Sequence, residues 1–173
     1  GDWAGMYRGA MCFPGNSEDA EEQAQCGALY NWYALGNGLL APSGWRIPAE
    51  YDWRTLKHTL ISEGHAAQVP GAGLRLGTAL AGSAGWKPSS RAGAVGNRLE
   101  LNNRSGFCGS PAGCRWADGE FGRAGEAGTW WSADAYDEVR AYAHALLHGC
   151  SELGTLLPTK RNGHSVRLVR DVG

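Results

Sequence analysis

The sequence predicts one α+β domain in which a helix and an antiparallel sheet share a core. Its 173 residues suffice for one hydrophobic core and leave little room for a second, so residues 1–173 are taken together. Residues 48–62 carry an apolar stripe at helical spacing, whereas the chain from Gly128 onward alternates with the period of two that strands require. The 27 glycines and 8 tryptophans favour many turns and large aromatic anchors over a helical bundle.

The helix predicted from Pro48 to Ser62 has the clearest signals in the chain. A proline suits its first turn, two acidic residues complement the positive end of the helix dipole, and a glycine follows its end. The acidic residues are Glu50 and Asp52, the apolar stripe is Trp53, Leu56 and Leu60, and the terminating glycine is Gly64.

Two segments precede this helix. Residues 16–25 are acidic and polar, with Asp19 and Glu22 in capping-box spacing, and we expect an exposed short helix or loop there. Residues 27–35 are dense in aromatics and predict a strand, or a strand leading into a helix, that buries Tyr30 and Trp32.

The remainder of the chain is read as short strands and turns. Residues 71–129 are rich in Gly, Ser and Pro, which indicates short strands joined by long loops. Residues 140–147 (RAYAHALL) alternate as a strand does, and Asn162–Gly163 is a turn signal followed by a strand from His164 to Arg170. The last third therefore predicts an antiparallel sheet.

Composition argues against some partners. The net charge is −1, with 16 basic and 17 acidic residues spread along the chain, so no basic footprint for nucleic acid is present. No apolar run approaches the roughly 20 residues that span a bilayer, so we expect no membrane insertion.

The five cysteines lack the CxxC pairs of a zinc site, so disulfides or buried thiols are the better interpretations. Two pairs local in sequence, Cys12 with Cys26 and Cys108 with Cys114, would leave Cys150 alone. His144 and His148 form an HxxxH pattern, but the glutamate of a zinc-binding HExxH helix is missing and the segment reads as a strand. We expect no metal and no cofactor.

Three segments carry a family resemblance: LAPSGWRIPAEYDWRTL, GTWWSA and KRNGHSVRLVRD, in that order. Together they resemble the Fibrobacter major paralogous domain, a relative of the formylglycine-generating-enzyme fold, over residues 12–171. The resemblance implies a C-type lectin-like fold with twisted antiparallel strands, about two helices and long loops.

In this group, the segment between the paired tryptophans and the terminal Ser-Val-Arg strand resembles the part that diversity-generating retroelements rewrite, here about residues 133–159. Their template is rich in Asn codons whose adenines are replaced during reverse transcription. The framework positions of such segments match Trp130, Trp131, Ser132, Ala141, Tyr142, Leu146, Ser151, Leu153 and Lys160.

The positions left over resemble the variable, ligand-binding ones. They are Tyr136, Asp137, Val139, Arg140, Ala143, Ala145, Leu147, His148, Gly149, Cys150, Gly154, Leu156, Leu157, Pro158 and Thr159, together with Glu152 and, beside them, Glu138. Scrambling the first two bases of an Asn codon keeps a third-base pyrimidine and cannot yield Lys, Gln, Glu, Met or Trp. Only the two glutamates break this rule, so they are either framework residues or come from another codon.

Strand parity suggests how a scaffold and a binding surface coexist in this segment. We expect Ala143, Ala145 and Leu147 on the solvent face, with the alternate residues holding the core. Those core residues are Tyr142, His144 and Leu146. Exposed aromatic and arginine side chains are typical of binding surfaces, and the anchors here would be Tyr136, Arg140 and His148.

The resemblance thus implies a retroelement-diversified protein without a catalytic role, which presents a hypervariable surface to a cell-surface protein or glycan. Its place would be a virion surface, the cell exterior or the envelope. Apolar residues at Leu147, Leu156, Leu157 and Pro158 favour a protein target over a sugar. One alternative is a copper oxidase of the formylglycine-generating type using Cys108 and Cys114, although a structural disulfide there is preferred. The other is an invariant envelope or adhesion module.

Overall fold

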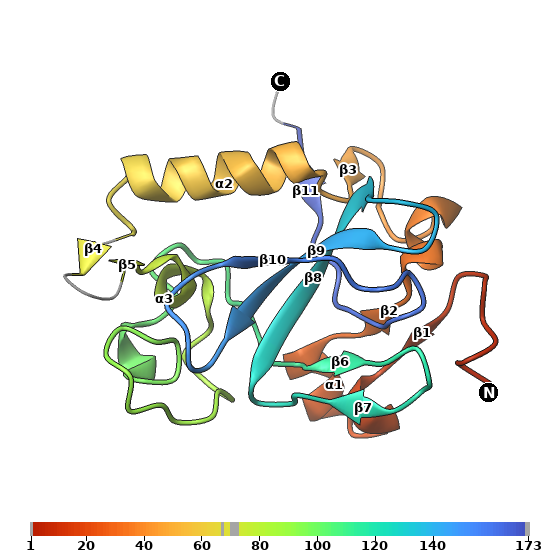
Figure 1. Ribbon diagram of the computed structural model, residues 1–173, viewed down its shortest axis with the longest axis horizontal. Coiled ribbons are helices and arrows are strands. Elements are labelled where there is room, and N and C mark those ends of the chain that lie inside the picture. The colour runs from red at the N-terminus through yellow and green to blue at the C-terminus, as the bar shows by residue number, and fades with distance from the viewer. Residues whose placement is uncertain (1, 67, 70–72, 172–173) are drawn as a thin grey trace.

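The α+β architecture is built around one three-stranded antiparallel sheet, and helix α2 lies on one side of this sheet (Figure 1). The computed structural model describes residues 2–66, 68–69 and 73–171. The strand order in the central sheet is β10-β9-β8, so β9 has a neighbour on each side. These strands are β8 (Ala127–Ala135), β9 (Ala141–Leu147) and β10 (Gly154–Leu156).

Four two-stranded sheets surround this centre in the described residues, and all of them are antiparallel. They pair β1 (Met11–Cys12) with β2 (Leu29–Tyr30), β3 (Trp45–Arg46) with β11 (Val169–Arg170), β4 (Gln68–Val69) with β5 (Gly73–Leu74), and β6 (Cys114–Arg115) with β7 (Phe121–Gly122). The α-helices are α1 (Ala20–Cys26), α2 (Glu50–Ser62) and α3 (Leu76–Leu80), and the 3-10 helices are η1 (Pro14–Asn16), η2 (Trp32–Asn37) and η3 (Leu99–Leu101).

The helix predicted at residues 48–62 is confirmed as α2. The Asp52 carboxylate accepts the backbone N–H of Ala49 at 2.7 Å and pairs with Arg46, at 2.8 Å between Oδ1 and Nη2. The hydrogen bond from Arg46 holds the pKa of Asp52 below its usual range. Trp53 and Leu60 of the predicted stripe are buried. The acidic segment before it is also confirmed, since the Asp19 carboxylate caps α1 by accepting two backbone N–H groups.

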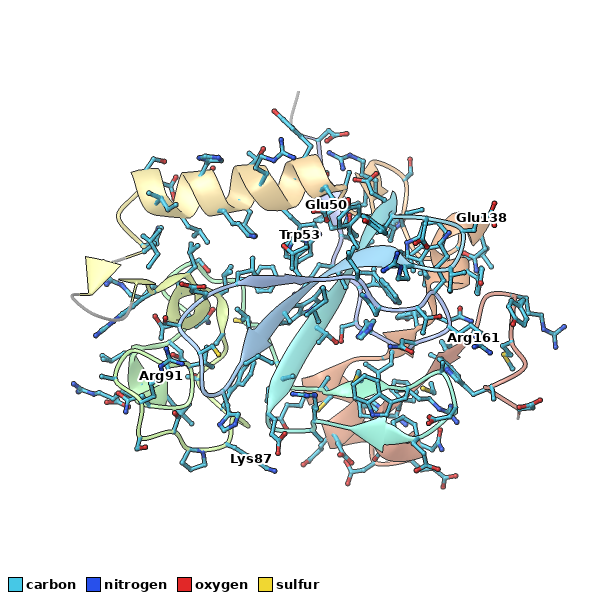
Figure 2. The ribbon with its side chains drawn as sticks, viewed as in Figure 1. Glu50, Trp53, Lys87, Arg91, Glu138 and Arg161 are labelled. Carbon is cyan, nitrogen blue, oxygen red and sulfur yellow. The ribbon has the colours of Figure 1, made fainter. Side chains whose placement is uncertain are left out.

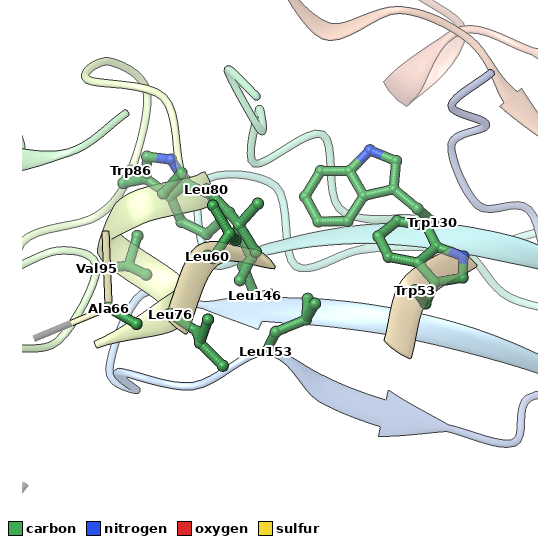
Figure 3. Close-up of a cluster of buried hydrophobic side chains, with 11 residues drawn as sticks. Trp53, Leu60, Ala66, Leu76, Leu80, Trp86, Val95, Trp130, Leu146 and Leu153 are labelled. Carbon is green, nitrogen blue, oxygen red and sulfur yellow. The ribbon is translucent and has the colours of Figure 1, made fainter. Parts of the chain in front are cut away.

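Both faces of the central sheet are covered. On one face, Trp130 and its cross-strand partner His144 meet α2, where Trp53 stacks on His144 with ring centroids 4.5 Å apart. Leu146 adds to this cluster, which extends to α3 (Figure 3). On the other face, Trp131 lies beside Ala143, and its ring meets the ring of His164 edge-on at 4.6 Å.

The prediction that Ala143 and Ala145 face solvent is wrong. Their exposed fractions are 0% and 3%. The alternation along β9 is real, but both of its faces are covered, because Trp131, Val166 and the side chains of Trp32 and Leu35 from η2 pack on the alanine side. Of the three predicted solvent-facing residues, only Leu147 is partly exposed.

Three further expectations need correction. Leu29 and Asn31 are the fully buried residues of segment 27–35, whereas Tyr30 and Trp32 are half-buried. The strand expected over 164–170 is interrupted: residues 164 and 165 form isolated β-bridges, residues 166–168 have no strand pairing, and only β11 at its end is a strand. Helix α3, with five residues, was not predicted inside segment 71–129.

The predicted disulfides are also wrong, because all five cysteines are free. Cys114 lies buried on β6, and burial raises the pKa of its thiol to about 11. Cys108 is exposed on a loop, where its Sγ accepts a hydrogen bond from the Asn103 side chain at 2.8 Å. Cys12 is buried and Cys26 packs against the same small cluster without a bond joining them. Among the described residues, no helix is long and apolar enough to cross a membrane.

Candidate ligand-binding surface

Most of the predicted binding positions lie at the protein surface. We call the exposed and half-buried ones the candidate surface: Tyr136, Asp137, Val139, Arg140, Leu147, His148, Gly149, Cys150, Glu152, Gly154, Leu156, Leu157, Pro158 and Thr159. Ala143 and Ala145 do not belong to it. Thr155, exposed in the middle of β10, lies on the same edge and was not predicted, although Thr satisfies the codon rule and could have been found by it.

The tip of the β8–β9 hairpin is an internally bonded unit. The Asp137 carboxylate accepts the backbone N–H groups of Val139 and Arg140 at 2.9 and 2.6 Å and pairs with the Arg140 guanidinium. Hydrogen bonds from Arg140 hold the pKa of Asp137 below its usual range. The Arg140 guanidinium lies 4.8 Å above the Tyr136 ring, which meets Tyr142 edge-on. The side chains at the tip are therefore arranged before any ligand arrives.

Lys160 holds this tip in place through contacts with the main-chain carbonyls of residues 137–139. It is 8% exposed, and its Nζ donates to the carbonyl oxygens of Asp137 and Glu138 at 2.8 and 3.3 Å. The same ammonium lies 4.5 Å from the Trp32 ring, and the Lys160 backbone N–H donates to the carbonyl of Val139. None of these contacts depends on which side chains stand at positions 137–139.

We expect Lys160→Met to lower the free energy of unfolding by about 2–3 kcal/mol, because two charged hydrogen bonds from a buried ammonium to main-chain carbonyls are lost. Proteolysis between β8 and β9 should become faster at the same time. Lys87→Met is the matched control: Lys87 is exposed, and its ion pair with Glu126 is worth about 1 kcal/mol or less. Equal losses in urea titrations of the two variants would contradict the anchoring role of Lys160.

The loop after β9 is held in the same way. The carbonyls of His148 and Cys150 accept the backbone N–H groups of Gly96 and Val95 at 2.8 and 2.9 Å, and the Ser151 carbonyl accepts that of Gly77 at 2.7 Å. Position 150 therefore contributes its backbone to the fold while its side chain is half-exposed.

Cys150→Ser is accordingly expected to change the free energy of unfolding by less than about 0.5 kcal/mol. A loss of several kcal/mol in a urea titration would show that the thiol itself packs in the core. Cys114→Ser serves as the comparison and should cost more, since Cys114 is 2% exposed.

Apolar side chains form a patch that covers both sides of the sheet edge beside the tip, because Leu156 and Leu157 point to opposite faces of the sheet. The pairings Leu156 with Ala143 and Arg140 with Thr159 place Leu157 opposite Tyr142, which Tyr136 contacts. Leu157, Leu156 and Val139 are 37%, 41% and 63% exposed. Because β10 is an edge strand, this patch is open on its outer side.

The three predicted anchors are not brought together. Tyr136 and Arg140 share the hairpin tip, whereas His148 follows the opposite end of β9, about 25 Å away at the rise of a strand. The candidate surface therefore has two ends joined by the edge of β10. Asp134, although inside segment 133–159, is structural, because its carboxylate accepts the Glu50 backbone N–H at 2.7 Å.

His144, the first histidine of the HxxxH pattern, packs in the core. His144 is buried, its Nε2 lies 2.8 Å from the Glu50 carboxylate, and its ring is stacked on Trp53. Across the described ranges, no group of three or more His, Cys, Asp or Glu side chains could hold a metal ion.

Comparison with known families identifies the chain. The family model described as the Fibrobacter succinogenes major domain matches residues 6–170. The chain belongs to this family. No curated protein matches it, and no solved structure does. The range matched by the Fibrobacter succinogenes major domain family includes the central sheet, α2 and the whole candidate surface. The match agrees with the resemblance to the Fibrobacter major paralogous domain found in the sequence.

Proposed function

We propose that this protein is a ligand-binding variable protein of C-type lectin-like fold, in which a diversity-generating retroelement rewrites the candidate surface. Its work is presentation: a constant core displays side chains that differ between copies, so that different copies bind different cell-surface targets. It has no catalytic role, and it acts on a virion surface, at the cell exterior or in the envelope.

One contrast carries the proposal. The framework residues act through buried side chains: Trp130, Trp131, Ser132, Ala141, Leu146, Ser151, Leu153 and Lys160 are buried, and Tyr142 is half-buried. Much of the candidate surface is held through its main chain, as at Val139, His148, Cys150 and Pro158, whose carbonyls accept the anchoring hydrogen bonds. Asp137 and Arg140, by contrast, also bond to each other through their side chains. Residues bonded only through the backbone can be replaced without loss of the fold.

The composition of the surface favours a protein as the target of this copy. Tyr136 and Arg140 are of the types enriched at protein interfaces, and the tip holds both in place. The apolar side chains of Val139, Leu156 and Leu157 flank them. A pre-arranged aromatic and arginine anchor beside an apolar strip reduces the entropy lost on binding.

Sequencing the gene across many isolates tests the genetic part. We expect substitutions concentrated at the candidate surface, framework codons unchanged, and a neighbouring reverse transcriptase gene with a template repeat that ends on the coding sequence for NGHSVRLVRD. Substitutions spread evenly along the chain would indicate an invariant envelope or adhesion module instead.

A tolerance experiment tests the structural part. Randomising Tyr136, Val139, Leu156 and Leu157 together should leave most variants folded, with thermal midpoints close to that of the parent. Randomising Trp131, Leu146 and Leu153 is the matched control and should leave few folded variants, since all three are buried. Similar folded fractions in the two libraries, measured by protease resistance on a display system, would contradict the proposal.

A further inference from the structure

A polar cleft opens between α3 and the loop that follows it, at the end of the molecule that lies far from the hairpin tip and next to the loop after β9. Its volume is about 570 Å³, within the range of small-molecule sites. Arg75, Arg98 and Arg104 line it, together with Asn97 and Thr78. Figure 2 places Arg91, on the same loop, at the opposite end of the molecule's longest axis from Glu138 at the hairpin tip.

The positive charge of this cleft is only partly compensated within the described residues. Arg98 pairs with Glu100 at 2.8 Å, and both are well exposed. Arg75 and Arg104 make no ion pair or side-chain hydrogen bond to any residue that the structure describes, and the Nε of Arg75 is buried without a partner. A buried guanidinium N–H without an acceptor is costly, so an acceptor from outside the chain would stabilise it.

The backbone makes room for the Arg75 guanidinium and holds the opposite wall in place. A Cβ on Gly93, whose φ is +78°, would lie 2.9 Å from Arg75 Nε, so only glycine lets the guanidinium lie there without a shift. Asn103 donates its backbone N–H to the Thr78 carbonyl at 2.8 Å, and the Ser105 hydroxyl donates to that of Ala79 at 2.6 Å. The residue between them, Arg104, thus stands on a loop fastened to α3.

We propose that this cleft binds an acidic saccharide, with Arg75 and Arg104 holding its carboxylate or sulfate group. Guanidinium groups match the planar or tetrahedral oxygens of such anions. Asn97 and Thr78 each keep capacity for a sugar hydroxyl: the Asn97 amide donates one N–H to the Ser89 carbonyl and retains its oxygen and second N–H, and the Thr78 hydroxyl donates to the Arg75 carbonyl and can still accept. Among the described lining residues, the His65 imidazole is the one aromatic ring and no Trp, Tyr or Phe is present to stack on a nucleic-acid base, while Leu101 is the one large apolar side chain; this lining disfavours a nucleotide or a lipid.

The site lies outside residues 133–159. Every diversified copy would therefore carry it, and it would attach the protein to an acidic surface polysaccharide whatever the candidate surface recognises. This consequence rests on the proposed function, whereas binding in the cleft does not, so the two can fail independently.

Isothermal titration with four probes tests the proposal: glucuronic acid, glucose 6-sulfate, glucose and inorganic sulfate. We expect saturable binding of at least one acidic sugar at millimolar concentration or below, and weaker binding of glucose and of sulfate. The acidic sugar with the higher affinity shows whether the cleft prefers a carboxylate or a sulfate group. The saccharide assignment would be overturned if neither acidic sugar bound saturably, or if inorganic sulfate bound as tightly as the two acidic sugars.

Variants locate the binding. Arg104→Gln, at an exposed residue, should weaken the acidic sugar about tenfold or more, and Arg75→Gln should do the same. Arg54→Gln removes an equal charge from the exposed side of α2 and should leave the affinity unchanged. Gly93→Ala should weaken binding by displacing Arg75. Unchanged affinity in Arg104→Gln together with Gly93→Ala would overturn the site.

Discussion

Trp131→Ala is expected to lower the free energy of unfolding by about 3–5 kcal/mol, the largest effect of a single substitution in the central sheet. Trp131 is fully buried, its indole N–H donates to the Tyr30 carbonyl at 2.7 Å, and its ring meets His164 edge-on. Its neighbours on β9 are Ala141 and Ala143, which are too small to fill the cavity left behind. For a domain whose total stability is about 5–15 kcal/mol, this change comes close to unfolding it.

Urea titrations followed by far-ultraviolet circular dichroism measure the effect without relying on tryptophan fluorescence. Trp116→Ala is the matched control, since Trp116 is 37% exposed and should cost about 1 kcal/mol or less. Trp131→Phe keeps most of the ring volume and should lose about 1–3 kcal/mol, because the indole hydrogen bond to the Tyr30 carbonyl is lost while that carbonyl keeps its bond from the His164 backbone N–H. If the two alanine variants lost equal stability, the packing of Trp131 would not be what holds this face of the sheet.

Local signals were enough to predict the elements that are determined locally. The acidic first turn and apolar stripe predicted α2, and the period of two predicted β9. The capping-box spacing at Asp19 left a short helix or a loop open, and the structure has the helix, α1. A five-residue helix such as α3 shows no full amphipathic repeat, and so it could not be recognised.

The errors concern contacts between distant segments. Alternation along β9 separates its faces, but it cannot show that side chains of η2 and Val166, which are distant in the sequence, pack on the alanine face, so Ala143 and Ala145 were assigned to solvent. Cysteine spacing likewise gives no distance between Cβ atoms, and Cys108 and Cys114 have different surroundings although they are six residues apart.

The candidate surface shows the same division. Residue-by-residue resemblance predicted which positions are framework and which are variable. Eight of the nine predicted framework residues are buried and Tyr142 is half-buried, but Ala143 and Ala145 among the predicted variable positions are buried as well. The sequence could not reveal that main-chain carbonyls anchor the variable positions, because a backbone hydrogen bond leaves no mark on residue type. The role of Lys160 emerges only from its contacts with Asp137, Glu138 and Trp32.

His164 makes the fold sensitive to acid. The Thr129 hydroxyl donates to the Gly113 carbonyl at 3.1 Å, so it must accept from Nδ1–H of His164, 2.7 Å away. Nε2 is then the unprotonated nitrogen, and it is buried without a partner in the described structure. A proton added there would place an unpaired charge in the core, and burial accordingly lowers the pKa of His164 to about 3.

The sign of the pH effect follows from this shift. Because the folded pKa of His164 lies below the unfolded value of about 6.5, its contribution is fully present above pH 6.5 and is lost as the pH falls toward 3. The unfolded chain binds one more proton in this window, so the free energy of unfolding should fall by about 1.4 kcal/mol per pH unit, or about 2.7 kcal/mol by pH 4.5. Burial also lowers the pKa of His144, which adds in the same direction.

Urea titrations at pH 7, 6, 5 and 4.5 measure this slope. His164→Gln should reduce the slope by the amount that corresponds to about one bound proton. His58→Gln, at an exposed position on α2, should leave the slope unchanged. Carboxylates such as Asp52, whose pKa is held below its usual range by Arg46, begin to lose their contribution only below about pH 5, so the slope between pH 7 and 5 reports the histidines, and the difference between the two variants isolates His164 at pH 4.5. An equal slope in the two variants would contradict the assignment, as would an NMR titration in which the native His164 ring gains its proton above pH 5. A flattened slope would show that the histidine joining the C-terminal segment to Trp131 must stay neutral for the sheet to keep both of its faces covered.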